Sequence, residues 1–206
     1  MWQFAQAVEG MAAACRALEI PITGGNVSLY NETDGRAVLP TPVVGVIGLI
    51  EDANRVVRRV FRAEGDAVVL LGTSRDELGG SEYLAVVHGI VRGVPPALDL
   101  TGEAALQRVL VEGSARGLIR SAHDCAEGGL AVTMAECSFN TGLGAEVDVP
   151  AVDSTVPALR DHATLFGESA SRVVVSVTQD HTDALLALAS SHGVPAAVIG
   201  RVGGDR

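Results

Sequence analysis

Apolar side chains recur at helical spacing in some parts of this chain and form short unbroken runs in others. At the start, apolar residues three or four positions apart predict a helix over residues 3–19. The apolar runs at 43–50 and 67–71 are bounded by proline, glycine or acidic residues, which predicts buried strands. Further helices are expected at 82–88, 102–116, 130–139 and 182–191, and further strands at 20–23, 119–122, 145–149, 172–178 and 196–202.

The order of these elements predicts an α+β fold with a mixed sheet layered with helices. The last three elements form a strand–helix–strand unit with short loops, which favours a sheet covered by helices over a helical bundle. A new start at Gly65 and Asp66 follows an amphipathic turn over residues 54–61. We therefore expect two parts, residues 1–62 and residues 63–206.

All fifteen residues in the combined lysine and arginine count are arginine, so the chain has no lysine. This excludes a phosphate-binding loop built on a Gly-Lys-Ser/Thr triplet and Schiff-base chemistry on lysine. Any phosphate must then be held by backbone N–H groups, arginine, hydroxyl groups or a metal. The formal net charge of −10 argues against a nucleic-acid partner.

The sequence indicates a cytoplasmic protein with no membrane partner. Its longest apolar runs are too short to span a bilayer, and the segment after Met1 lacks the basic and apolar regions of a secretory signal. The cysteines Cys15, Cys125 and Cys137 have no Cys-x-x-Cys spacing. We therefore expect buried or half-buried free thiols rather than disulfides or a zinc site.

The polar run that follows Pro21 has the side chains of a phosphate and magnesium site. Its two glycines lack Cβ atoms, so an anion can approach their N–H groups. The asparagine and glutamate oxygens are hard ligands of the kind that magnesium takes beside phosphate, and the serine hydroxyl can donate to a phosphate oxygen. A polar turn between two strands is the alternative. The residues concerned are Gly24, Gly25, Asn26, Ser28, Asn31 and Glu32.

A second polar cluster, from His123 to Gly129, precedes an expected helix. Its two glycines resemble an anion site at a helix N-terminus. The alternative is that Asp124 or Glu127 simply caps the helix. A metal triad of histidine, aspartate and glutamate would need three side chains of one turn to converge.

Two more polar clusters lie at residues 77–83 and 165–172. In the first, Ser81 is expected to be a helix N-cap. In the second, Glu168, two serines and Arg172 precede a strand, where open sheets often place ligand-facing residues. The alternative is a solvated turn with a Glu168–Arg172 ion pair. The other histidines have no evident partner and are expected at the surface or as satisfied core residues: His88, His162, His181 and His192.

Seven motifs, in their order along the chain, resemble the C-terminal third of phosphoribosylformylglycinamidine synthase, the large ATP-using subunit of purine biosynthesis. The likeness covers nearly the whole chain, and the Gly-Asn-Val-Ser-Leu-Tyr-Asn-Glu element is specific to this enzyme within its superfamily. The motifs lie at residues 2–4, 23–32, 39–45, 77–83, 95–99, 121–130 and 165–169.

The resemblance implies part of one domain followed by a whole one. The family's large subunit is a tandem duplication of two-domain units. Residues 1–62 then correspond to the C-terminal remnant of an ATP-binding α+β domain, and residues 63–206 to a complete domain like the C-terminal domain of aminoimidazole ribonucleotide synthase. Because Trp2 and its neighbours correspond to a buried part of the family's subunit, the chain is expected to begin within a domain and to be inactive alone.

The resemblance also implies an activity and its partners. The family's enzyme uses ATP and magnesium (Mg2+) to activate the amide oxygen of formylglycinamide ribonucleotide. Ammonia from a glutamine amidotransferase then displaces the phosphate, which gives formylglycinamidine ribonucleotide. The implied protein partners are the amidotransferase subunit, a small accessory subunit and the remainder of the large subunit.

Three site residues follow from matching positions. Gly25 resembles a nucleotide-contacting glycine, Asn26 a magnesium ligand and Ser28 a substrate-contacting hydroxyl. The family's catalytic histidine belongs to parts that have no counterpart here, so no catalytic residue is expected. Gly167 stands where the family more often has serine, which weakens a ligand role for its turn.

Two other functions stay open. Another member of the superfamily, such as aminoimidazole ribonucleotide synthase, selenophosphate synthetase or thiamine-phosphate kinase, would use ATP on a different substrate, but the Asn26 to Glu32 element disfavours this. The other alternative is a non-catalytic assembly module whose sheet face binds a partner. Apolar surface exposed by truncation would then promote self-association.

Overall fold

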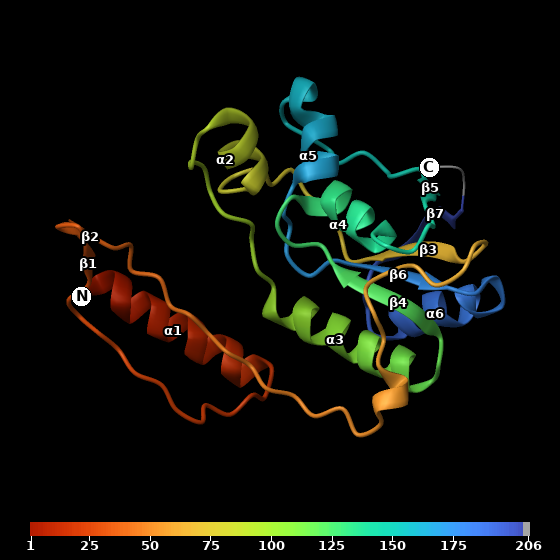
Figure 1. The fold of residues 1–206 in the computed structure, drawn as a ribbon, viewed down its shortest axis with the longest axis horizontal. Helices are drawn as coiled ribbons and strands as arrows, with labels where there is room; N and C mark the ends of the chain where they lie inside the picture. Colours follow the sequence, from red (N-terminus) through yellow and green to blue (C-terminus); the bar gives the residue numbers. More distant parts are fainter. Residues whose placement is uncertain (204–206) are drawn as a thin grey trace. The chain divides into compact units, whose positions relative to one another are not determined.

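The computed structural model describes residues 1–203 and divides the chain into two compact units, Met1–Glu51 and Asp52–Arg206. The first unit contains helix α1 (Trp2–Ala17) and a hairpin of two short strands, β1 (Glu32–Thr33) and β2 (Arg36–Ala37) (Figure 1). The second unit contains a five-stranded sheet and the other helices. The last three residues of the predicted second domain lie outside the described residues.

Much of the first unit's apolar sequence faces solvent. The helix predicted over residues 3–19 is confirmed as α1. The strands predicted at 20–23 and 43–50 are wrong, because neither segment is a strand and Val43 and Ile47 are 95% and 99% exposed. A strand needs a neighbour for its backbone N–H and C=O groups. Within residues 1–203, no segment pairs with either of these two.

The sheet of the second unit has the strand order β4-β6-β3-β7-β5. Its central strands, β3 (Ala67–Leu71) and β6 (Val173–Val177), are buried throughout, which explains their unbroken apolar sequences. All neighbouring strands pair antiparallel, and Leu71 lies opposite Val173 on one side and Ala196 on the other. The edge strands are β4 (Ile119–Asp124) and β5 (Ala145–Val147), and β7 (Ala196–Val202) lies between β3 and β5.

Helices cover both faces of this sheet (Figure 1). On one face, α3 (Leu100–Ala115) and α6 (Gln179–Ser191) pack on odd-numbered residues of β3 and β6. On the other, α4 (Gly129–Ser138) packs on the even-numbered ones, and α5 (Arg160–Phe166) contacts α4. The remaining helices are α2 (Glu82–His88) and two short 3₁₀ turns, Ala53–Arg55 and Pro157–Leu159.

Residues 52–62 pack with the second unit, although the sequence placed them in the first part. The Phe61 side chain is 2% exposed and belongs to the core beneath α4. Its N–H donates to the carbonyl of Cys137 at 2.8 Å, and Arg58 forms an isolated parallel bridge with Ser121 at the edge of β4. The first compact unit therefore ends at Glu51, and the domain boundary at 62/63 stays a prediction.

The predicted α+β class, a helix-layered sheet preceded by a smaller α+β part, is confirmed. The sheet is antiparallel rather than mixed as predicted, because all of its neighbouring strands run in opposite directions. None of the helices formed by residues 1–203 combines the length and apolar character that crossing a bilayer requires. The expected free thiols are also confirmed: Cys15 is half-buried, and Cys125 and Cys137 are buried. Burial raises the pKa of Cys137 to about 12.

Candidate functional site

The polar loop predicted as the phosphate and magnesium site lies in the first unit and is exposed along its length. Neither Gly24 nor Gly25 has a φ angle in the left-handed region, and a side chain at either would meet no atom within 4 Å. Backbone strain therefore does not require glycine here. What the missing Cβ atoms provide is open access to the N–H groups, as an anion-binding loop needs.

The three predicted site residues, Gly25, Asn26 and Ser28, stand side by side on this loop without contacting one another through a hydrogen bond. The Ser28 hydroxyl donates to the carbonyl of Tyr30 at 3.1 Å. Because the Ser28 hydroxyl donates its hydrogen to this carbonyl, a ligand that accepts from Ser28 would have to replace this hydrogen bond.

The donor types in the loop fit magnesium. Asn26 and Asn31 offer amide oxygens and Glu32 a carboxylate, and magnesium is usually bound by one or two protein oxygens beside phosphate and water. Residues 1–203 contain no group of three or more His, Cys, Asp or Glu side chains that could hold a metal by themselves. The oxygen atoms of the loop therefore fit magnesium by type.

The loop continues into the β1–β2 hairpin, which the sequence analysis missed. Thr33 pairs with Arg36, and the N–H of Val38 donates to the carbonyl of Asn31 at 3.3 Å. Asp34 and Gly35 make the turn with φ angles of 51° and 73°. Asp-Gly is a strong signal for a two-residue hairpin turn, so this element could have been predicted.

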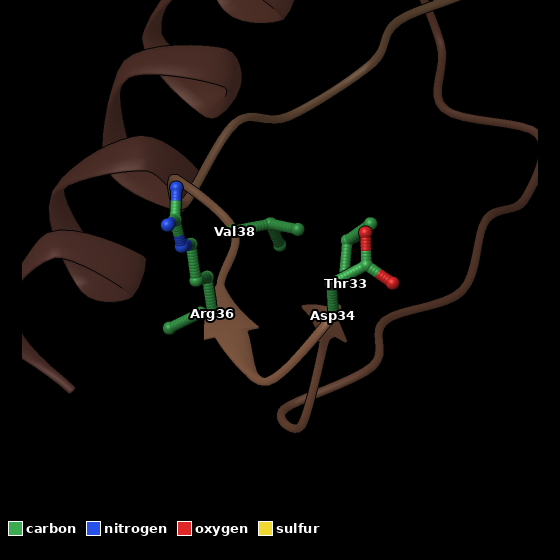
Figure 2. Close-up of a pocket in the computed structure, with 5 residues that line it drawn as sticks. Thr33, Asp34, Arg36 and Val38 are labelled. Carbon is green, nitrogen blue, oxygen red and sulfur yellow. The ribbon is translucent and has the colours of Figure 1, made fainter.

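A hollow of about 550 Å³ opens beside this hairpin. Figure 2 shows Thr33 and Asp34 on one side of the hairpin and Arg36 and Val38 on the other side. The Arg36 guanidinium extends away from the Asp34 carboxylate. The hollow therefore combines a hydroxyl, a carboxylate and a guanidinium directly after the polar loop.

In the second unit, three of the predicted clusters meet at Glu168. Its carboxylate oxygen Oε1 accepts hydrogen bonds from the backbone N–H of Gly128 at 2.8 Å and of Glu82 at 2.9 Å. Its own N–H donates to the carbonyl of Glu77 at 3.2 Å. One carboxylate thus serves the first residues of both α2 and α4, where free N–H groups and the helix dipole favour negative charge.

This contact changes the interpretation of the glycine pair before α4. The negative group at this helix N-terminus is Glu168 from a distant segment, rather than the bound anion that the sequence suggested. The suggested caps Asp124 and Glu127 are wrong, because the cap residue is Gly128 without a side-chain cap of its own. Ser81 is confirmed as the cap of α2, accepting from Leu84 N–H.

The Glu168–Arg172 ion pair is also wrong. Arg172 is 2% exposed, and its guanidinium donates to the carbonyls of Ser169 and Gly167 and to the hydroxyl of Ser74. Burial lowers the pKa of Arg172, an effect that nearby acidic groups oppose. These bonds hold the turn before β6 together, which is a structural role rather than a ligand-facing one.

The histidines are partnered more fully than the sequence indicated. His123 contacts Glu136 at 2.7 Å and Asp124 at 3.3 Å, which links β4 to α4 rather than forming the suggested triad with Glu127. His162 hydrogen-bonds the Tyr83 hydroxyl at 2.6 Å, and His192 contacts Glu112 at 3.2 Å. These contacts join residues of separate helices and strands, so the partner of each histidine cannot be predicted from residue spacing within one element.

Two family descriptions cover most of the chain. The C-terminal domain of AIR synthase related protein matches residues 63–206, and the N-terminal domain matches residues 1–50. The chain belongs to the AIR synthase related family.

Among curated relatives, the chain is similar to phosphoribosylformylglycinamidine synthase subunit PurL, which confirms the resemblance read from the motifs. It is 52% identical to the Moorella thermoacetica protein over 203 residues and 52% identical to the Thermobifida fusca protein over 206 residues. These matches cover 98% and 100% of this chain but 27% and 26% of those proteins. The chain thus spans about a quarter of the length of the relatives it matches.

Solved structures support the fold. Thermotoga maritima PurL complexed with FGAR has a TM-score of 0.62 at 20% identity, covering 73% of this chain and 26% of that one. The same protein complexed with ATP has a TM-score of 0.58 at 22% identity, covering 74% and 24%.

Proposed function

We propose that this chain contributes a nucleotide- and magnesium-binding loop to a phosphoribosylformylglycinamidine synthase. The reaction is the ATP- and magnesium-dependent conversion of formylglycinamide ribonucleotide and glutamine-derived ammonia to formylglycinamidine ribonucleotide, a carbon–nitrogen ligase step of purine biosynthesis. The observation that carries the proposal is the 52% identity, along the whole chain, to relatives named for this enzyme.

In this proposal, the loop acts through three neighbouring residues. The Gly25 N–H contacts the nucleotide, the Asn26 amide oxygen binds magnesium and the Ser28 hydroxyl contacts the substrate. Magnesium would supply positive charge at the phosphate. The exposure of all three residues and the open backbone at the glycines support these roles.

The rest of the machinery is proposed to lie outside these 206 residues. Because the relatives are about four times longer than the matching segment, we propose that this chain alone does not catalyse the reaction. Its proposed partners are the remaining large-subunit sequence, a glutamine amidotransferase subunit and a small accessory subunit. The description of one Thermotoga maritima structure as PurLQS supports this part of the proposal.

A chimera tests the proposal. The matching quarter of Moorella thermoacetica PurL is replaced by this chain, and ADP release that depends on formylglycinamide ribonucleotide and ammonia is measured. We expect activity, and a loss of about 100-fold for Asn26→Leu, since removing one metal ligand weakens charge stabilisation at the phosphate. Gln6→Leu, an equivalent change at an exposed residue of α1, is the control. An active Asn26→Leu chimera with unaltered magnesium dependence contradicts the proposal.

A second candidate is a module for assembly without chemistry. The exposed apolar side chains of the first unit favour it, with Ile47 99% and Leu49 90% exposed. Sedimentation at several concentrations tests this candidate on the isolated chain. Self-association that Ile47→Asp and Leu49→Asp abolish supports it, whereas a monomer at every concentration contradicts it.

A further inference from the structure

The proposed loop has no positive charge of its own. Gly25, Asn26 and Ser28 are neutral, whereas the phosphate groups of a nucleotide or a ribonucleotide are negative. The chain has no lysine, and the first unit contains two basic residues, Arg16 in the last turn of α1 and Arg36 on β2. Within the first unit, a phosphate bound at this loop therefore has two arginines as candidate cationic partners.

The hairpin fixes Arg36 close to the end of the loop. Asp34 and Gly35 reverse the chain, so Arg36 lies opposite Thr33 instead of continuing away from it. The hydrogen bond from Val38 N–H to the Asn31 carbonyl ties the returning strand to the last residues of the loop. The backbone therefore presents Arg36 from a short, defined element.

The Arg36 side chain is exposed and has no carboxylate within ion-pair distance among residues 1–203. Figure 2 shows its guanidinium directed away from Asp34, the nearest acidic residue in the sequence. Arg36 lines the hollow together with Thr33 and Val38. A guanidinium without a carboxylate partner keeps all five N–H donors available in a planar fork, the arrangement that binds phosphate through two parallel hydrogen bonds.

We propose that Arg36 is an anion-binding residue that holds a phosphate group of a phosphate ester or polyphosphate ligand at the hairpin. This rests on the proposed function, because it assigns a cation to the same site. Arginine suits this role better than lysine would, since its fork matches two phosphate oxygens at once. Thr33 pairs with Arg36 in the hairpin, and its hydroxyl offers one more donor.

The test uses the 206-residue chain, isotope-labelled for nuclear magnetic resonance, with inorganic pyrophosphate as the probe and EDTA present to remove metal. We expect pyrophosphate to shift the amide signals of residues 33–38 and the Nε–H signal of Arg36. Arg36→Gln should weaken binding about five-fold, a modest factor because the site is exposed to solvent. The pyrophosphate affinity of Arg36→Lys should lie between those of the unchanged chain and Arg36→Gln, because lysine keeps the positive charge but lacks the planar pair of N–H donors.

Arg16→Gln is the matched control, because it removes the other arginine of the first unit and the same charge. It should bind pyrophosphate as the unchanged chain does. If the hairpin signals do not move, or if Arg36→Gln binds as tightly as Arg16→Gln, the inference is overturned.

A parallel titration with ATP and magnesium separates this inference from the proposed function. If Arg36→Gln loses pyrophosphate binding while Asn26→Leu keeps the magnesium dependence of ATP binding, Arg36 binds anions and the proposed role of the loop fails. If Asn26→Leu loses that dependence while Arg36→Gln matches the control, the role of the loop stands and the inference about Arg36 fails.

Discussion

The carboxylate of Glu168 accepts a hydrogen bond from the backbone N–H of Gly128, 40 residues earlier in the chain, at 2.8 Å. The same oxygen accepts from Glu82 N–H at 2.9 Å, so a single charge caps two helices. Both contacts place negative charge at positive helix ends. Glu168 therefore stabilises the positions of α2 and α4 on the sheet and fills the place that the sequence suggested for an external anion.

We expect Glu168→Gln to lower the free energy of unfolding by about 1–2 kcal/mol, because the amide keeps an acceptor but loses the charge that strengthens both hydrogen bonds. Urea unfolding followed by circular dichroism measures the change. Glu127→Gln is the matched control, since Glu127 is exposed and was the cap that the sequence suggested. Equal stabilities for the two variants would show that Glu168 does not carry the capping energy.

The sequence predicted the second unit far better than the first. The strand Ala67–Leu71 and the helix Glu82–His88 have the predicted bounds, because an apolar run and a serine cap are local signals. The run at 43–50 has the same local pattern as a buried strand, yet strand formation depends on a neighbour that no local pattern specifies. Helix Arg160–Phe166 was missed because it is short and its first residues are polar.

The candidate site shows the same division. The loop with Asn26 and Ser28 could be proposed as a site from sequence because its candidate ligand atoms are concentrated in one segment. The meeting of three segments at Glu168 was not found, since residues 77–83, 121–130 and 165–169 are far apart in sequence. Arg36 was missed for another reason: without the hairpin, nothing relates it to the loop.

Phe61 tests where the second unit begins. Its side chain is buried in the core beneath α4, although it precedes the predicted boundary. Phe61→Ala should lower the free energy of unfolding by about 3–4 kcal/mol, through lost burial and the cavity left behind. Phe139→Ala removes the same group from a side chain that is 51% exposed, and should cost less than about 1 kcal/mol. A small effect at Phe61 would mean that residues 52–62 do not contribute to this core.

The three thiols should differ in reactivity. Burial raises the pKa of Cys137 to about 12 and also raises the pKa of Cys125, so neither forms the reactive thiolate in the folded protein. Cys15 is only half-buried on α1. A disulfide reagent added at pH 8 should therefore modify one thiol quickly in the folded chain and three in denaturant. Cys15→Ser should abolish the fast phase; a fast phase that persists in this variant contradicts the assignment.

Asp66 makes stability depend on pH. It is 4% exposed, its Oδ2 lies 3.3 Å from Arg120 Nε, and that oxygen accepts no hydrogen bond within residues 1–203. Burial raises the pKa of Asp66 above its ordinary value of 3.8, and Arg120 only partly opposes this. The folded protein thus holds the proton more tightly than the unfolded chain.

The contribution of this carboxyl to the free energy of unfolding is therefore greatest below pH 3.8. It declines as the pH rises from 3.8 to the raised pKa of the folded protein, and above that pKa it stays constant at its lower level. Asp66→Asn removes this pH-dependent destabilisation. The free energy of unfolding of the variant, relative to that of the unchanged protein, should therefore increase as the pH rises above 3.8 and stay higher at pH 7. A pKa difference of one corresponds to about 1.4 kcal/mol. Urea unfolding at a series of pH values measures the difference, with the exposed Asp153→Asn as control. If the Asp66→Asn and Asp153→Asn curves run parallel across this range, the carboxyl at Asp66 is not destabilised by burial.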